Sequence, residues 1–181
     1  DRNSLLLSYL DAEVPAGFLT LVDRRMTSEP VAYILGHREF WTLDLKVLPG
    51  VLIPRPDSET LIEAALKWFG PRAPATILDL GTGSGALLLA ALSEFPEAEG
   101  MGVDQSPTAL AVAAENATRC GLQARVRFRA GNWGQGVDGP FDLILCNPPY
   151  ISTDAELPAT VVHFEPREAL FAGGDGLDDY R

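Results

Sequence analysis

The residues best suited to chemistry in this chain are Asn147, Pro148, Pro149 and Tyr150, which follow an apolar run at 141–146. The run predicts a short buried strand, so these residues lie at its carboxyl end, where open α/β sheets bind ligands. The prolines lack N–H groups and favour extended backbone, which leaves nearby carbonyl groups free. The Asn147 side-chain oxygen and the Pro148 carbonyl can each accept one hydrogen of an NH2 group, while the Tyr150 ring packs on its plane. The alternative is a tight turn with a surface tyrosine.

A glycine-rich loop between an apolar strand at 77–80 and an apolar helical run at 86–92 is the second candidate site. Glycine permits positive φ and close approach of a ligand, and the helix start offers free N–H groups, so we expect an anionic group there. Asp79 beside the loop favours a ligand that is also positively charged, as S-adenosyl-L-methionine is. The spacing also fits the dinucleotide fingerprint, which leaves a nicotinamide-binding domain as an alternative. The candidate cofactor-binding residues are Asp79, Gly81, Thr82, Gly83, Ser84 and Gly85.

Further candidates follow the next two predicted strands. Asp104 ends a short strand about 20 residues beyond the glycine loop, which is the spacing of a carboxylate that accepts both hydroxyls of a ribose. The alternative is that Asp104 caps the next helix, but Ser106 can do so and leave Asp104 free. After the following strand, Asn132 can hydrogen-bond an adenine edge, and Trp133 either stacks on the adenine or belongs to the core.

Together these motifs resemble the Rossmann-like S-adenosylmethionine-dependent methyltransferases, in the branch that Asn-Pro-Pro-Tyr marks as acting on amino groups. The segments at 30–36, 51–59 and 165–177 resemble the peptide chain release factor glutamine methyltransferases, the HemK family. The resemblance implies methyl transfer from S-adenosyl-L-methionine to the side-chain nitrogen of the glutamine in a Gly-Gly-Gln tripeptide of release factors. It also implies that the Asn-Pro-Pro-Tyr segment holds the glutamine amide and that Asn147 borders the cofactor.

The chain departs from the family pattern at few positions: Asp57 and Ser58 stand where Glu and Thr are usual, and Asn132 stands where Asp is usual. An amide nitrogen is a poor nucleophile because its lone pair is delocalised into the carbonyl. Two acceptors on its hydrogens would align it and stabilise the positive charge that develops during transfer. His37 and His163 lie outside the motifs. We therefore expect catalysis by positioning, with both histidines in surface or packing roles.

Composition and charge narrow the functional classes. The chain has 181 residues, of which 46% are hydrophobic and 22% charged, and no apolar run reaches membrane-spanning length. Cys120 and Cys146 provide neither a disulfide framework nor metal-ligand spacing, so we expect a cytoplasmic protein without a metal. The net charge of −11 argues against direct nucleic-acid binding, although adenine and cytosine amino methyltransferases share Asn-Pro-Pro-Tyr. The alternating arginines at 125–129 predict the solvent face of a strand.

The chain divides into three expected parts. Residues 1–36 predict a small helical domain that recognises the substrate, 37–56 a hairpin and linker, and 57–181 a methyltransferase domain. Helices are expected at 58–69 and from Pro107 onward. Four parallel strands are fewer than the resembled class contains, so we expect an α/β sheet that is incomplete at its C-terminus, with an unpaired edge at the fourth strand. The remaining alternative is a cofactor-binding module without catalysis.

Overall fold

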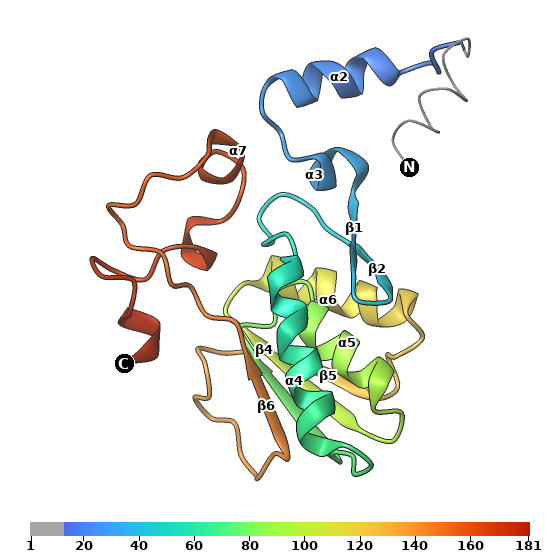
Figure 1. The fold of residues 1–181 in the computed structure, drawn as a ribbon, viewed down its shortest axis with the longest axis vertical. Helices are drawn as coiled ribbons and strands as arrows, with labels where there is room; N and C mark the ends of the chain where they lie inside the picture. The colour runs from blue at the N-terminus through green and yellow to red at the C-terminus, as the bar shows by residue number, and fades with distance from the viewer. Residues whose placement is uncertain (1–12) are drawn as a thin grey trace.

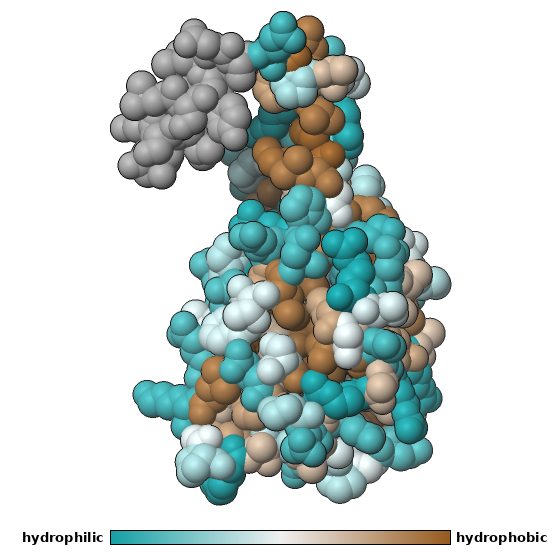
Figure 2. Space-filling model, turned by 90° about the vertical axis from the view of Figure 1, so that its right-hand side faces the viewer, coloured by the Kyte–Doolittle hydropathy of each residue, from teal (hydrophilic) through white to brown (hydrophobic). Residues whose placement is uncertain are grey.

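Two short helices open the computed structural model, which describes residues 13–181. They are α2 (Phe18–Met26), which starts after Gly17 at φ 85°, and α3 (Val31–Leu35). Both stand above the main body of the molecule (Figure 1), and α2 buries none of its residues. Apolar side chains are exposed along this part (Figure 2), including Leu19 and Met26. The helical prediction is confirmed for the described residues, whereas positions 1–12 of the predicted helical domain lie outside them.

A β-hairpin connects these helices to the sheet. It consists of β1 (His37–Phe40) and β2 (Leu43–Lys46), which pair antiparallel around a tight turn. Trp41 in the turn has φ 56°, a conformation that few residues other than glycine adopt. Leu45 is fully buried and joins the main core. The hairpin prediction is therefore confirmed.

The main sheet has four strands, all parallel, as the sequence predicted. They are β3 (Thr76–Leu80), β4 (Glu99–Asp104), β5 (Val126–Ala130) and β6 (Leu143–Cys146), in the spatial order β5-β4-β3-β6. Within the described part of the chain, β6 pairs only with β3, so it forms an edge. Ile144 on this strand is 57% exposed. All four carboxyl ends point to the same edge, where the candidate residues lie (Figure 1).

Three helices lie together on one side of this sheet (Figure 1): α4 (Glu59–Phe69), α5 (Ala86–Glu94) and α6 (Pro107–Arg119). A short 3-10 turn (Pro56–Ser58) leads into α4. Because α5 packs against both α4 and the sheet, every residue from its start to Leu92 is buried. An all-apolar helix is stable only in such a setting.

The buried face of α6 differs from the prediction. The sequence favoured a face made of Leu110, Ala111, Ala114 and Ala117. The residues that are actually buried are Ala109, Val112, Ala113, Asn116 and Ala117. A prediction of the buried face of α6 from its apolar residues alone was wrong, because that face includes a polar residue, Asn116, which is fully buried. Its hydrogen bonds to the hairpin and to the glycine loop compensate for its burial.

The prediction that all three alternating arginines face solvent is wrong for Arg125. Its guanidinium is half-buried and donates hydrogen bonds of 2.8–3.1 Å to two carbonyl groups at the C-terminal end of α5, those of Leu92 and Phe95, and to the Ala98 carbonyl in the turn beyond. Those carbonyls have no partner within the helix and lie at the negative end of its dipole, so a cation is favoured there. Arg127 and Arg129 are exposed as expected. No helix in residues 13–181 has the length and apolar character to cross a membrane.

After β6 the chain returns over the carboxyl edge of the sheet. It contains α7 (Ala159–Val162) and 3-10 turns at Arg167–Ala169 and Asp178–Tyr180. A single parallel bridge joins Ile151 to Phe171. This segment, the hairpin and the sheet edge together surround the candidate site.

Candidate functional site

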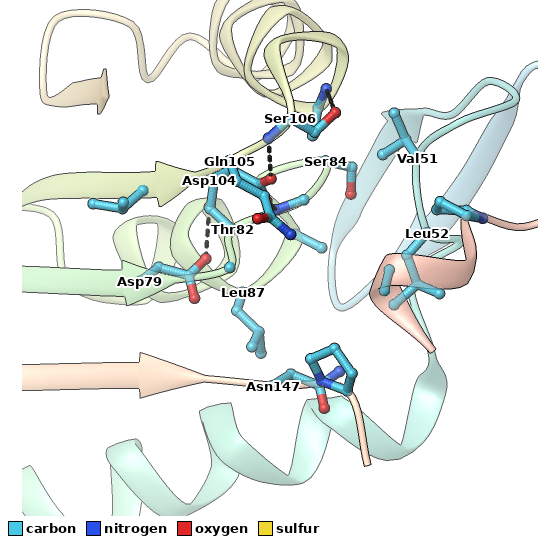
Figure 3. A pocket seen from close by; sticks show the side chains of 18 of the residues that line it. Val51, Leu52, Asp79, Thr82, Ser84, Leu87, Asp104, Gln105, Ser106 and Asn147 are labelled. Atoms are coloured by element: carbon cyan, nitrogen blue, oxygen red, sulfur yellow. Dashed lines mark hydrogen bonds between the residues drawn. The ribbon is translucent and has the colours of Figure 1, made fainter. Parts of the chain in front are cut away.

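A cavity of about 190 Å³ opens at the carboxyl ends of β3, β4 and β6, facing Val51 and Leu52 (Figure 3). We call it the first cavity. The structure brings together nearly all the predicted cofactor-binding residues in its wall. Those that line it are Asp79, Gly81, Thr82, Gly83, Ser84, Asp104, Asn132, Trp133 and Asn147. Pro149 lines it too.

The glycine loop at 81–85 is fixed to the neighbouring strand. The N–H groups of Gly81 and Thr82 donate to the carbonyl of Val103 at 2.9 and 3.0 Å, and the Gly83 N–H donates to Asp104 Oδ2 at 2.8 Å. These three loop N–H groups are therefore already bonded, and the free N–H groups that the sequence predicted are those of the helix that follows. The start of α5 has no side-chain cap, so its first turn retains the N–H groups that an anionic group can use.

Gly85 is the one predicted cofactor residue that does not line the first cavity. It has φ 83° and lies behind the loop, against α6. A Cβ atom at this position would lie 3.2 Å from Leu89 and 3.3 Å from Ala113. Gly85 therefore permits the close packing of the loop on α6, and its small size matters for the loop's position. Gly83, with φ 56°, has open space instead where a Cβ would be.

Asp104 is not left free, contrary to the expectation. Its Oδ2 accepts from Gly83, and its Oδ1 accepts from the Ser106 N–H at 2.9 Å. Ser106 does cap α6 as predicted, since its Oγ accepts from the Ala109 N–H at 3.2 Å. Asp104 thus holds the glycine loop and the start of α6 in place. Each carboxylate oxygen can accept a second hydrogen bond, so the ribose contact stays a prediction.

Asp79 has the most perturbed environment in the first cavity. Its side chain is 1% exposed; Oδ2 accepts from Thr82 Oγ1 at 2.7 Å, and Oδ1 has no partner among the described residues. Burial raises the pKa of Asp79 to about 7; the Thr82 hydroxyl and the Leu88 backbone N–H oppose this shift, and the charge of Asp104 adds to it. A buried carboxylate without a full set of partners is costly, and a cationic ligand would stabilise its charged form.

Asn132 and Trp133 form the wall beyond β5. Trp133 has φ 50°, and its ring lies 3.4 Å from where a Cβ on Gly81 would be. It is half-buried and lines the cavity, so the reading of Trp133 as a core residue is wrong. Asn132 is exposed at the same rim. Both are placed to contact a ligand, while stacking on adenine stays a prediction.

A second cavity, of about 280 Å³, lies on the other side of Asn147. Pro148 and Tyr150 line it, and Tyr150 forms an exposed rim with 61% of its surface accessible. Asn147 lines both cavities, and its Nδ2 donates to Ser58 Oγ at 3.1 Å. The Asn147 side-chain oxygen is therefore the atom left to accept a hydrogen bond at the junction.

Arg55 and Glu165 hold the two loop walls together. Arg55 lines both cavities, and its Nη2 lies 2.7 Å from Glu165 Oε1. The Glu165 side chain is 2% exposed, and its Oε2 accepts from the Ile53 N–H at 3.2 Å. Arg55 therefore braces the loop that carries it. Sequence reasoning missed Glu165, whose only signal was its place in the 165–177 motif segment.

Several other lining residues were also missed. They come mainly from the loop at 50–58, the position after Asp104, and the turn at 166–169. Only the motif resemblance pointed to these segments, because their residue types have no obvious chemistry. The two histidines line neither cavity: His37 Nδ1 lies 2.6 Å from Asp44 Oδ1, and His163 is exposed. This confirms the prediction that both have surface or packing roles.

Residues 72–167 match the family model described as "Methyltransferase domain". The chain belongs to this methyltransferase family. It is similar to proteins named "Release factor glutamine methyltransferase": it is 52% identical to that of Rhodospirillum rubrum, covering 89% of this chain and 50% of that protein. It is 46% identical to the protein of that name from Moorella thermoacetica, covering 97% of this chain and 64% of that protein. The chain spans between 50% and 64% of the length of such relatives. The resemblance seen in the sequence is confirmed.

Solved structures agree with the fold of this chain. The human Mettl16 catalytic domain, solved in complex with the MAT2A 3′UTR hairpin 6, has a TM-score of 0.61, with coverage of 82% of this chain and 57% of that one. A delta-N METTL16 methyltransferase domain has a TM-score of 0.54, covering 71% and 62%. The identities are 17% and 16%, so these likenesses concern the fold alone. The predicted α/β methyltransferase fold is confirmed.

The methyltransferase match also confirms the predicted cofactor, S-adenosyl-L-methionine. The first cavity fits such a molecule. Among the described residues, Asp79 Oδ1 is a buried acceptor without a hydrogen-bond partner, which suits a cationic ligand, and the start of α5, which has no side-chain cap, suits its carboxylate. Gly83 leaves the adjoining space open. The residues that would hold the cofactor are therefore those of the glycine loop, Asp79 and Asp104.

Proposed function

We propose that this chain transfers a methyl group from S-adenosyl-L-methionine to the side-chain amide nitrogen of the glutamine in the Gly-Gly-Gln motif of peptide chain release factors. The observation that carries the proposal is the position of Asn147 between two cavities. One cavity fits the cofactor, and the other opens beside the Asn-Pro-Pro-Tyr segment. The names of the relatives point to the same substrate.

Asn147 and Pro148 would orient the amide for the reaction. The Asn147 side-chain nitrogen donates a hydrogen bond to Ser58 Oγ. The side-chain oxygen would therefore face the incoming NH2 group as an acceptor. The Pro148 carbonyl would accept the second hydrogen. The bound cofactor supplies an electrophilic methyl group. Two acceptors align the amide nitrogen and stabilise the charge that grows on it, so positioning and electrostatics carry the catalysis.

We assign the parts of the chain to this function as follows. The helical residues up to 36 recognise the protein substrate, 37–56 link them to the sheet, and 57–181 carry the methyltransferase site. The exposed apolar side chains of α2, among them Leu19 and Met26, support a recognition role, because contiguous apolar surface often marks a protein-binding site. Release factors as partners, without direct nucleic-acid binding, place the protein in the cytoplasm.

The experiment that tests the proposal is methyl incorporation from labelled S-adenosyl-L-methionine by the full-length enzyme. The substrates are a release factor, the same factor with Gly-Gly-Ala in place of Gly-Gly-Gln, and duplex DNA. We expect label only on the first. Label on DNA would move the function to the nucleic-acid branch. Cofactor binding without label on any substrate would indicate a module without this activity.

Asn147→Ala should lower kcat for methyl transfer at least about tenfold, because one acceptor of the transition state is lost. The cofactor Kd should change much less. Asn132→Ala is the matched control, since Asn132 lines only the first cavity and its loss should act on cofactor binding. Full turnover by Asn147→Ala would contradict the two-acceptor mechanism.

A further inference from the structure

The second cavity is mostly aliphatic. Its polar groups gather near Asn147, and Arg55 beside it is already paired with Glu165. Beyond the Asn-Pro-Pro-Tyr segment and Arg55, the wall consists of Leu52, Ile151, Leu157, Val161, Ala169 and Leu170. Its volume of about 280 Å³ approaches the lower end of what small-ligand pockets have, so it is larger than an amide group needs.

A Gly-Gly-Gln tripeptide offers this wall little apolar surface. Its glycines have no side chains, and the glutamine must bring its amide to Asn147 for the proposed reaction, so only its two methylene groups could contact the wall. Aliphatic surface is stabilised when an apolar group replaces the water against it. The wall therefore matches a residue outside the tripeptide.

Backbone hydrogen bonds hold the aliphatic wall in shape. The Ile151 N–H donates to the Leu170 carbonyl at 3.0 Å, and the Ala172 N–H donates to the Ile151 carbonyl at 2.9 Å. Leu170 itself is 5% exposed and forms the floor. Val161 comes from α7, so three separate parts of the segment after β6 meet around one hollow.

We infer that the second cavity is a specificity subsite that binds an aliphatic side chain next to the Gly-Gly-Gln tripeptide of the substrate. This inference rests on the proposed function and adds to it a requirement on the substrate's sequence. The aliphatic side chain anchors the peptide in the cavity, and the glutamine amide is thereby held at Asn147. The subsite distinguishes among substrates that all carry the tripeptide.

The first test varies the substrate and uses the full-length enzyme. The residues flanking the tripeptide of a release factor are changed in turn to valine, threonine and aspartate, and methyl transfer is measured for each. At one flanking position, threonine should raise KM about fivefold over valine, because a hydroxyl replaces a methyl group in an apolar wall. Aspartate should raise KM at least about tenfold. Equal KM for all substitutions would overturn the subsite and leave the proposed function intact.

The second test varies the enzyme with a matched pair of variants. Val161→Thr alters the wall, whereas Val162→Thr changes the neighbouring residue of α7, which lines neither cavity. Val161→Thr should raise KM about fivefold for the valine-flanked substrate and less for the threonine-flanked one. Val162→Thr should leave both unchanged.

Each outcome of the two tests has a distinct meaning. Coupling between Val161 and the flanking residue supports the subsite. Equal effects of Val161→Thr on both substrates would overturn it, because the effect would then not depend on contact with that side chain. Absence of label on every release factor would instead overturn the proposed function.

Discussion

The two cavities on either side of Asn147 are held in different ways. The inner wall of the first cavity belongs to the sheet and its helices, with the glycine-loop N–H groups bonded to β4, and the loops at 50–58 and 166–169 complete its rim. The wall of the second cavity is made mainly of loop segments and α7, joined by one isolated bridge and by the bonds of Glu165 to Arg55 and Ile53. The cofactor side is thus preformed, whereas the substrate side depends on few contacts.

This difference suits the proposed chemistry. A cofactor is the same molecule in every turnover, so a rigid site fixes its methyl group at no cost at the time of reaction. A protein substrate must enter and leave, and segments with few buried contacts open at low free energy. Changes in the first wall should therefore alter stability and cofactor affinity, and changes in the second should alter turnover.

The largest expected effect concerns Asp79 in the first wall. Its pKa is about 7 in the folded protein and near 3.8 without burial, so the stability that its protonated form contributes is present below about pH 4 and lost as pH rises through 7. Without cofactor, Asp79→Asn should gain stability relative to wild type by up to about 4 kcal/mol between pH 4 and pH 8. Urea unfolding at several pH values measures this. Parallel pH profiles for the two proteins would contradict it.

Asn116 tests whether buried polar bonds hold the first wall together. Asn116→Ala should lower the free energy of unfolding by about 3 kcal/mol, because it removes bonds to both backbone groups of Lys46 and leaves the Ser84 carbonyl unpaired. The neighbouring Glu115→Ala is the control. It removes only an exposed ion pair with Lys46 and should cost less than about 1 kcal/mol. Similar losses for both variants would show that Asn116 has no special role.

Gly83→Val separates binding from folding in the same wall. Valine would be strained at φ 56° and would project into the open space beside Asp104, so cofactor affinity should fall at least about a hundredfold by calorimetry. Gly121→Val carries the same kind of strain, at φ 71°, away from both cavities. It should lower stability to a similar degree with affinity retained. Loss of affinity in both variants would attribute the effect to folding.

Glu165→Gln is the test of the second wall. Removing the charge weakens the contact between the loop at Arg55 and the segment that carries Glu165. We expect kcat/KM for methyl transfer to fall about tenfold while the cofactor Kd stays the same. Glu156→Gln, at an exposed site of the same segment, should be neutral. A fall in cofactor affinity equal to the fall in kcat/KM would show that the two walls are not independent.

The elements with a strong sequence pattern were predictable. Strands such as β3 and helices such as α5 have continuous apolar runs and glycine punctuation, so their type and order followed from local rules. The glycine loop, Asp104 and Asn147 were predictable as site residues because strand ends in such sheets meet at one edge.

The contacts between distant segments were not predictable in this way. The distances of 110 residues from Arg55 to Glu165 and 70 residues from Lys46 to Asn116 leave no periodic signal in the chain. The prediction that Arg125 faces solvent was wrong for the same reason, because its partners are carbonyl groups at and beyond the end of another element. Buried polar groups are placed by tertiary structure, and pattern rules assign them to the surface.

Because of Asn116, a measurement on the hairpin can report whether the glycine loop is in place. Its side chain accepts the Lys46 N–H at 2.7 Å and donates to the Ser84 carbonyl at 2.9 Å, so one amide links β2 to the loop. The Lys46 amide proton can exchange with solvent only when this link opens. Its rate of deuterium exchange would therefore report, in the hairpin, how tightly the loop is closed around a bound cofactor.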